Sequence, residues 1–175
     1  RGRSRRRTPG GRIERARLLA GDAGLAARRA IWRGVPARLD GTGASVAVLA
    51  EQLLASLDTV LEPLRQRQAR EVAALEDRIV RYGERGSGRR ELDERHKREQ
   101  RRVRADELRF GLVALASVYR DALVNGPVAG VPADRAAAVA AIEAIDAAGE
   151  ALIRNPNEQL LLQGLLAHLT DLAVS

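Results

Sequence analysis

Apolar residues recur at helical spacing through most of the chain, and no stretch alternates between apolar and polar residues as a half-buried strand does. The longest helical pattern covers residues 44–80. Its apolar positions are Val46, Leu49, Leu53, Leu57, Val60, Leu64, Val72, Leu75 and Ile79. Pro63 lies within this run and is expected to kink the helix or to mark a new start, because proline lacks an N–H and clashes with the preceding turn. The pattern predicts an all-α fold, a helical bundle.

Further helices are predicted between clusters of Gly, Pro, Asn and Asp, which favour turns. One short helix follows residue 11, and the others cover about 23–33, 89–123, 134–148 and 156 to the end of the chain. Thr42 is a possible cap for the helix that begins near 44. On helix 134–148, Val139, Ile142 and Ile145 are expected to share the buried face. The glycine-rich loop at 83–88 and residues 1–12 are expected to be open to proteases.

The final helix has a well-marked start and a strongly apolar body. We expect Asn155 to be its N-cap, Pro156 its first helical residue and Glu158 the acid of a capping box. The leucines that follow cover more than half of the circumference, so neighbouring helices must enclose this helix. The residues expected at a partner interface are Tyr119, Asn155, Asn157, Leu161, Leu162, Leu165 and Leu169.

Composition narrows the class of protein. The 175 residues suffice for one substantial core, and the chain has no cysteine for disulfides or thiolate metal sites. No apolar run approaches the roughly 18–20 residues that span a bilayer, and no signal peptide is recognisable. These features predict a soluble, cytoplasmic protein. Because Met is absent, the chain is expected to be a fragment of a longer protein.

Groups suited to catalysis are sparse. His96 and His168 lack a second histidine at metal-binding helical spacing. The stretch from Gly83 to Arg90 lacks the lysine and the hydroxyl of a phosphate-binding loop. We therefore expect no catalytic activity, no cofactor and no metal.

The net charge of +7, almost all of it from arginine, leaves two interpretations of helix 89–109. In one, the helix is a track for a phosphate backbone. In the other, its charges are balanced on a solvated surface, with pairs four residues apart: Glu91–Arg95, Asp93–Lys97 and Glu94–Arg98. The absence of an aromatic residue to stack on bases favours the second interpretation.

Three segments resemble the delta-prime subunit of bacterial DNA polymerase III in its actinobacterial form. The first runs from Glu91-Leu92-Asp93-Glu94-Arg95 to Tyr119-Arg120-Asp121, and the second is Asn155-Pro156-Asn157-Glu158-Gln159-Leu160 with the leucine run after it. The third, Gly11-Arg12-Ile13-Glu14-Arg15-Ala16-Arg17, resembles the sensor-2 stretch in the lid of clamp-loader subunits, except that the family commonly has Gly where this chain has Glu14.

The resemblance implies a clamp-loader subunit without its nucleotide-binding domain. Residues 1–21 would be a basic segment and the end of a lid domain of the AAA+ family, residues 22–39 a connecting helix, and residues 40–175 a helical collar. Arg15 would match the sensor-2 arginine. The implied function is structural: the collar holds the subunit ring that loads the sliding clamp, its partners are the other clamp-loader subunits, and it contacts DNA only indirectly or weakly. The alternatives are a basic helical nucleic-acid-binding module and a helical adaptor unrelated to replication.

Overall fold

The computed structural model describes residues 23–82 and 88–174, and within these ranges it contains five α-helices and no strand. The helices are α2 (Ala23–Arg33), α3 (Gly43–Tyr82), α4 (Arg89–Asn125), α5 (Arg135–Ala151) and α6 (Glu158–Val174), with short 3₁₀ turns η1 (Pro36–Arg38) and η2 (Leu152–Arg154). The prediction of an all-α bundle is confirmed for this part of the chain. The helix expected after residue 11 and the loop at 83–87 lie outside it.

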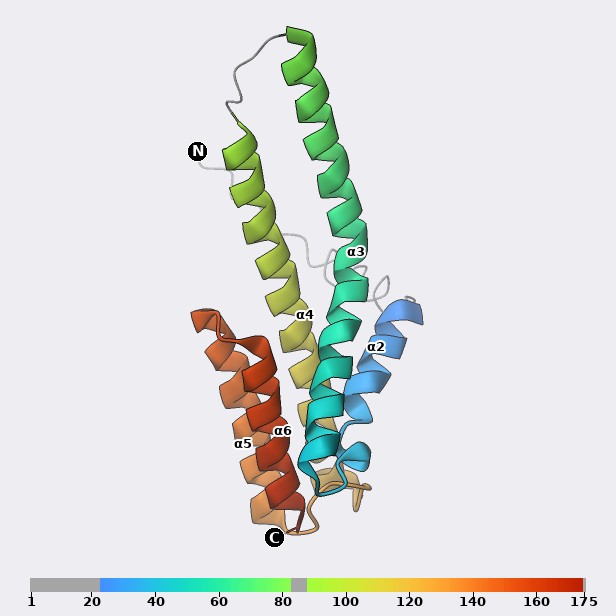
Figure 1. The fold of residues 1–175 in the computed structure, drawn as a ribbon. Helices are drawn as coiled ribbons and strands as arrows, with labels where there is room; N and C mark the ends of the chain where they lie inside the picture. Colours follow the sequence, from blue (N-terminus) through green and yellow to red (C-terminus); the bar gives the residue numbers. More distant parts are fainter. Residues whose placement is uncertain (1–22, 83–87, 175) are drawn as a thin grey trace, which may run out of the picture.

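The two long helices α3 and α4 run antiparallel and form the axis of the molecule (Figure 1). Helices α2, α5 and α6 pack around only one half of this hairpin. The other half, residues 62–82 and 88–104, projects beyond them, and we call it the arm.

The core lies in the half of the hairpin that the shorter helices cover. Buried side chains of α3 follow the predicted helical spacing from Val46 to Leu61. The buried face of α4 begins at Leu108, where the sequence changes from polar to amphipathic. The buried residues of α5, which packs against α4 and α6, are Ala138, Ala141, Ile145 and Ala148. Small side chains let helix backbones approach closely, and α4 and α5 form the most extensive helix contact in the molecule.

Trp32, on α2, is the largest side chain of the core and is 1% exposed. It packs on α4 directly over Gly111, where an added Cβ would lie 2.0 Å from Cε2 of the indole. Gly111 therefore provides the space that the indole occupies. Two ion pairs flank this contact: Arg28 with Glu107 at 2.6 Å and Arg33 with Asp121 at 2.9 Å.

Two details of the predicted helices are corrected. Helix α3 continues through Pro63, so this residue does not start a new helix. Val139 is 39% exposed and lies off the buried face of α5, which the alanines supply instead. The expected cap at Thr42 is confirmed, because its Oγ1 accepts from the N–H of Ser45 at 3.2 Å.

Helix α3 is long enough, and over 18 residues apolar enough, to cross a membrane by length and composition alone, and about a third of that stretch is buried. An uninterrupted apolar run, the criterion applied to the sequence, does not detect this 18-residue stretch because polar residues interrupt it. Core helices of soluble proteins meet the same measure. The buried side chains of α3 belong to one continuous core with those of α4, α5 and α6.

Replacing Gly111 with Ala should destabilise the fold by about 1–3 kcal/mol, the usual cost of overpacking, because the new methyl group collides with Trp32. Chemical denaturation with tryptophan fluorescence measures the change. Gly164→Ala is the matched control: a Cβ there meets no atom within 4 Å, so the helix should gain up to about 1 kcal/mol. Equal stability of the two variants would contradict the proposed packing.

Candidate functional site

The residues expected at a partner interface fall into two groups. Tyr119, Leu162, Leu165 and Leu169 are buried inside the bundle, and Leu161 is half-buried. Asn155 and Asn157 are exposed in the connection between α5 and α6. Contact of any of them with a partner chain stays a prediction. The buried four already pack within this chain, so the surface open to a partner consists of other side chains.

The phenol of Tyr119 illustrates this burial. The residue is 0% exposed, and its hydroxyl has no hydrogen-bond partner among the described residues. Burial raises the pKa of Tyr119 to about 12 because the interior disfavours the phenolate. Tyr119 is therefore a neutral core residue of α4.

Asn157, rather than Asn155, caps α6. The side-chain oxygen of Asn157 accepts from the N–H of Leu160 at 3.1 Å, and its carbonyl accepts from Leu161 at 2.9 Å. Asn155 has a φ of 52° and ends η2 in the left-handed conformation, whereas an N-cap has extended backbone. The predicted cap was thus wrong by two residues, and so were the places given to Pro156 and Glu158.

Glu158 is the first residue of α6 and has a different role from the predicted capping box. Its carboxylate accepts from Nε of Arg104, whose Nη1 also lies 3.3 Å from Oδ1 of Asp58 on α3. This cluster ties three helices together where the arm leaves the bundle. Hydrogen bonding from Arg65, together with the charge of Arg104, holds the pKa of Asp58 below its usual value.

A shallow apolar groove runs between α5 and α6. Its walls are small or apolar: Ala144, Ala147, Ala148, Ala151, Leu160, Leu161, Gly164, Leu165 and His168. Leu160 is 67% exposed, and Ile153 on η2, outside the groove lining, is 78% exposed. Because Leu160, Gly164 and His168 are spaced four apart, they form one exposed stripe along α6. We call this surface the α5–α6 groove.

Sequence analysis identified the leucines of α6 but missed the small residues of the groove. Ala144, Ala147 and Ala151 recur every three or four residues on α5, and Gly164 interrupts the leucine run of α6. This spacing of small residues was the available signal.

The arm has half-buried apolar side chains, Val72, Leu75, Ile79 and Leu92 among them, but its buried residues are polar. Gln68 and His96 are buried between its helices. Nε2 of His96 lies 3.0 Å from Oε2 of Glu71, and Nε2 of Gln68 donates to Oε2 of Glu99 at 3.0 Å. Hydrogen bonding from His96, and then the charge of Arg95, hold the pKa of Glu71 below its usual value. His96 therefore has a structural partner on the opposite helix.

The three ion pairs predicted within helix 89–109 are replaced by others. Arg95 pairs with Glu71 and Arg89 with Glu76, both across the arm, while Lys97 pairs with Glu94 three residues before it. Glu71 and Glu76 of α3 lie level with Arg95 and Arg89 of α4 along the arm. These two ion pairs between helices also join the two helices of the arm.

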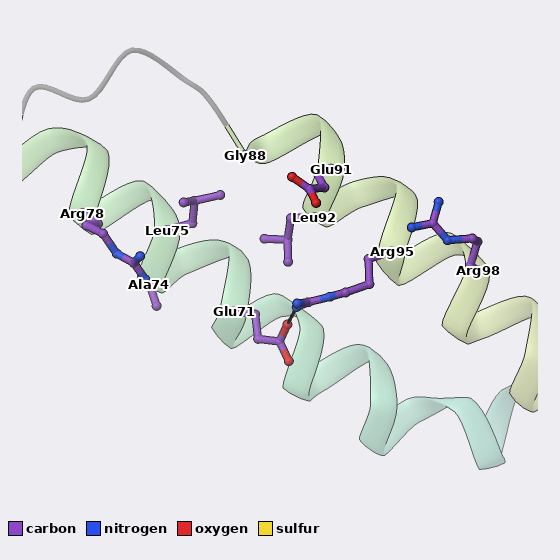
Figure 2. Close-up of a pocket in the computed structure, with 9 residues that line it drawn as sticks. All are labelled: Glu71, Ala74, Leu75, Arg78, Gly88, Glu91, Leu92, Arg95 and Arg98. Atoms are coloured by element: carbon purple, nitrogen blue, oxygen red, sulfur yellow. Dashed lines mark hydrogen bonds and ion pairs between the residues drawn. The ribbon is translucent and has the colours of Figure 1, made fainter.

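Figure 2 shows a pocket on one side of the arm, below Gly88. Arg78 of α3 and Arg98 of α4 line it from opposite helices, and Arg95 reaches across it to Glu71. Arg78 and Arg98 make no ion pair with another described residue.

The described ranges contain no group of three or more His, Asp or Glu residues arranged to hold a metal. Arg15, the candidate sensor-2 residue, lies outside those ranges. Comparison of the chain with known protein families, with curated proteins and with solved structures finds no match. The resemblance to the delta-prime subunit therefore rests on the residues quoted for it.

Asn157→Ala should lower the free energy of unfolding by roughly 0.5–2 kcal/mol, because the N–H of Leu160 loses its acceptor. Asn155→Gly should be neutral or slightly stabilising, because glycine adopts the left-handed conformation more readily than asparagine. Urea denaturation of both variants measures the difference. A larger loss for Asn155→Gly than for Asn157→Ala would contradict the assigned cap.

The lowered pKa of Glu71 predicts a dependence of stability on pH. Its ionised form is favoured in the folded arm, so this contribution is complete above the unfolded pKa near 4.5 and is lost as the pH falls through the folded value. Glu71→Gln should flatten the fall in stability below about pH 5. Glu62→Gln, at an exposed position that bonds only Gln66 within its own helix, is the control. Identical acid profiles for Glu71→Gln and the unmodified chain would contradict this role.

Proposed function

We propose that this chain is the structural collar domain of a clamp-loader subunit similar to delta-prime, and that it acts by holding neighbouring subunits in a ring. Support comes from the resemblance in segments 91–121 and 155–172. It also comes from the architecture, because the last two helices of the bundle, α5 and α6, pack side by side and together present a surface to solvent. The proposed role requires rigid placement of partners and no chemistry from the chain itself.

The observation that carries the proposal is the α5–α6 groove. Its lining is almost entirely apolar, and Leu160 in that lining is largely exposed to solvent in the isolated chain. Exposed apolar surfaces of this kind mark sites of protein interaction. Helices α5 and α6 are anchored beneath the groove by Ile145, Leu162 and Leu166, so the surface is presented on a rigid support.

The groove suits a helix of a neighbouring subunit. Alanine and glycine along its floor allow a second backbone to come close, and the leucines at its edge can interdigitate with side chains of the incoming helix. His168 is the one residue of the groove lining whose side chain can form a hydrogen bond. The partner is therefore an apolar helix face, as an equivalent collar domain would provide.

Gly164→Arg should abolish association with the other clamp-loader subunits while preserving the fold. A side chain at this position enters open space, and arginine is a better helix former than glycine. Size-exclusion chromatography with light scattering, on the chain mixed with those subunits, measures assembly. Circular dichroism measures the fold.

Two controls locate the effect. Ala55→Arg adds the same charge at an exposed position of α3 and should leave assembly intact. Replacing Arg95, Arg98 and Arg102 with Gln alters the arm and should also leave it intact. Normal assembly of Gly164→Arg, or loss of assembly on changing the three arginines, would contradict the proposed interface.

A further inference from the structure

We infer that one side of the arm is a binding surface for the phosphate backbone of duplex DNA, separate from the α5–α6 groove. The arm is basic as a whole: residues 62–82 and 88–104 contain thirteen Arg or Lys residues against eight Asp or Glu residues. It also projects from the bundle, so a long ligand can approach it without meeting the shorter helices (Figure 1).

Six arginines of the arm make no ion pair with another described residue: Arg70, Arg78 and Arg81 of α3, and Arg90, Arg98 and Arg101 of α4. Arg70, Arg78 and Arg81 are about two and three helical turns apart and share one side of α3. Arg78 of α3 and Arg98 of α4 line the pocket of Figure 2 from its two ends, with Arg95 between them. We call the four arginines Arg70, Arg78, Arg81 and Arg98 the basic face.

The members of the basic face are exposed, and none pairs with a carboxylate among the described residues. Three acids lie nearby. Glu71 is already engaged by Arg95 and His96, while Asp77 and Glu91 border the arginines without pairing with them. On the opposite side of the arm, Lys97 is paired with Glu94 and Arg65 with Asp58. Apart from Arg90 and Arg101 of α4, the exposed arginines of the arm without an ion pair are therefore those of the basic face.

The dimensions suit a phosphate backbone. From Arg70 to Arg81 the helix rises about 16 Å, at roughly 1.5 Å per residue. One strand of a duplex presents a phosphate about every 3.4 Å along its axis, so this length faces about five phosphates. Arginine binds phosphate oxygens in a bidentate manner.

The same surface is poorly suited to other anionic partners. Val80 is the large apolar side chain exposed at the distal end of the arm, at 84%, and a single valine does not make an apolar face. A membrane-bound helix needs an apolar face beside its basic one. Tyr82 is the one Phe, Trp or Tyr residue in segments 62–82 and 88–104, too few to stack on a run of single-stranded bases. Sequence-independent contact with a duplex remains the best match.

The test measures binding of the 175-residue chain to a fluorescent duplex of about 25 base pairs by anisotropy, between 50 and 200 mM salt. All proteins carry Gln in place of Arg1, Arg3, Arg5, Arg6 and Arg7, so that this segment does not supply the charge. Four phosphate contacts predict a loss of affinity of about 100-fold across this salt range, from a slope of about −0.9 per contact.

The variant with Gln at Arg70, Arg78, Arg81 and Arg98 should bind at least tenfold more weakly at 50 mM salt. Its salt slope should be smaller by about three to four. The matched control places Gln at four exposed arginines outside the arm, Arg29, Arg38, Arg135 and Arg154, and should lose little affinity and keep its slope. Lysine at the four basic-face positions should restore binding, and circular dichroism should show unchanged helix content.

Equal loss of affinity in the arm variant and the control would overturn the proposal, because it would reduce the effect to net charge. The proposal would also be overturned if the chain with an unmodified arm did not bind the duplex at 50 mM salt. A third contrary outcome is a chain that uses the arm to bind vesicles of phosphatidylserine and phosphatidylcholine but does not bind the duplex. The arm variant should still assemble with clamp-loader subunits. A negative result for DNA binding therefore leaves the proposed function untouched, because that function is tested by the assembly of Gly164→Arg.

Discussion

The division of the α3–α4 hairpin into a half with a buried apolar core and a half without one is the constraint on which the rest of the structure depends. In the half of the hairpin that carries Leu53 and Leu115, apolar side chains must be covered, and the shorter helices do so. In the other half, Gln68 and His96 replace leucines at the interface between the helices. Hydrogen bonds, ion pairs and half-buried apolar side chains such as Leu75 and Leu92 hold that half together, and it projects as the arm. Arg104 stands at the boundary and fastens α3, α4 and α6 to one another.

This division separates two surfaces of opposite character. The α5–α6 groove lies on the covered half and is apolar and nearly free of charge, which suits burial against another helix. The basic face lies on the arm and is hydrated, so it suits reversible, salt-sensitive contact with an anionic polymer. The packed core lies between the two surfaces and fixes their positions relative to each other. The proposed collar interface and the proposed DNA contact therefore use different surfaces of the chain.

Helix periods, and with them the all-α fold and the limits of α3 and α4, could be predicted because local apolar spacing decides them. Contacts between distant segments could not. The spacing of Arg95 from Glu91 favoured a pair within one helix, but Glu71 on the opposite helix takes that arginine. Asn155 and Asn157 are equally good caps by residue type, and the direction in which the chain leaves η2 selects the second. The leucines of α6 indicated an enclosed helix correctly, yet only the packed structure distinguishes the enclosed side from the groove.

The most direct measurement of the proposed interface uses the absence of cysteine from the chain. Single cysteines are introduced as Ala147→Cys and His168→Cys in the α5–α6 groove, and as Ala73→Cys at an exposed position of the arm. Thiol labelling rates are then compared in the free chain and in complex with the other clamp-loader subunits. Strong protection at positions 147 and 168, with an unchanged rate at 73, is the result that a collar interface predicts. Unchanged rates in the groove of a formed complex, with protection on the arm instead, would contradict it.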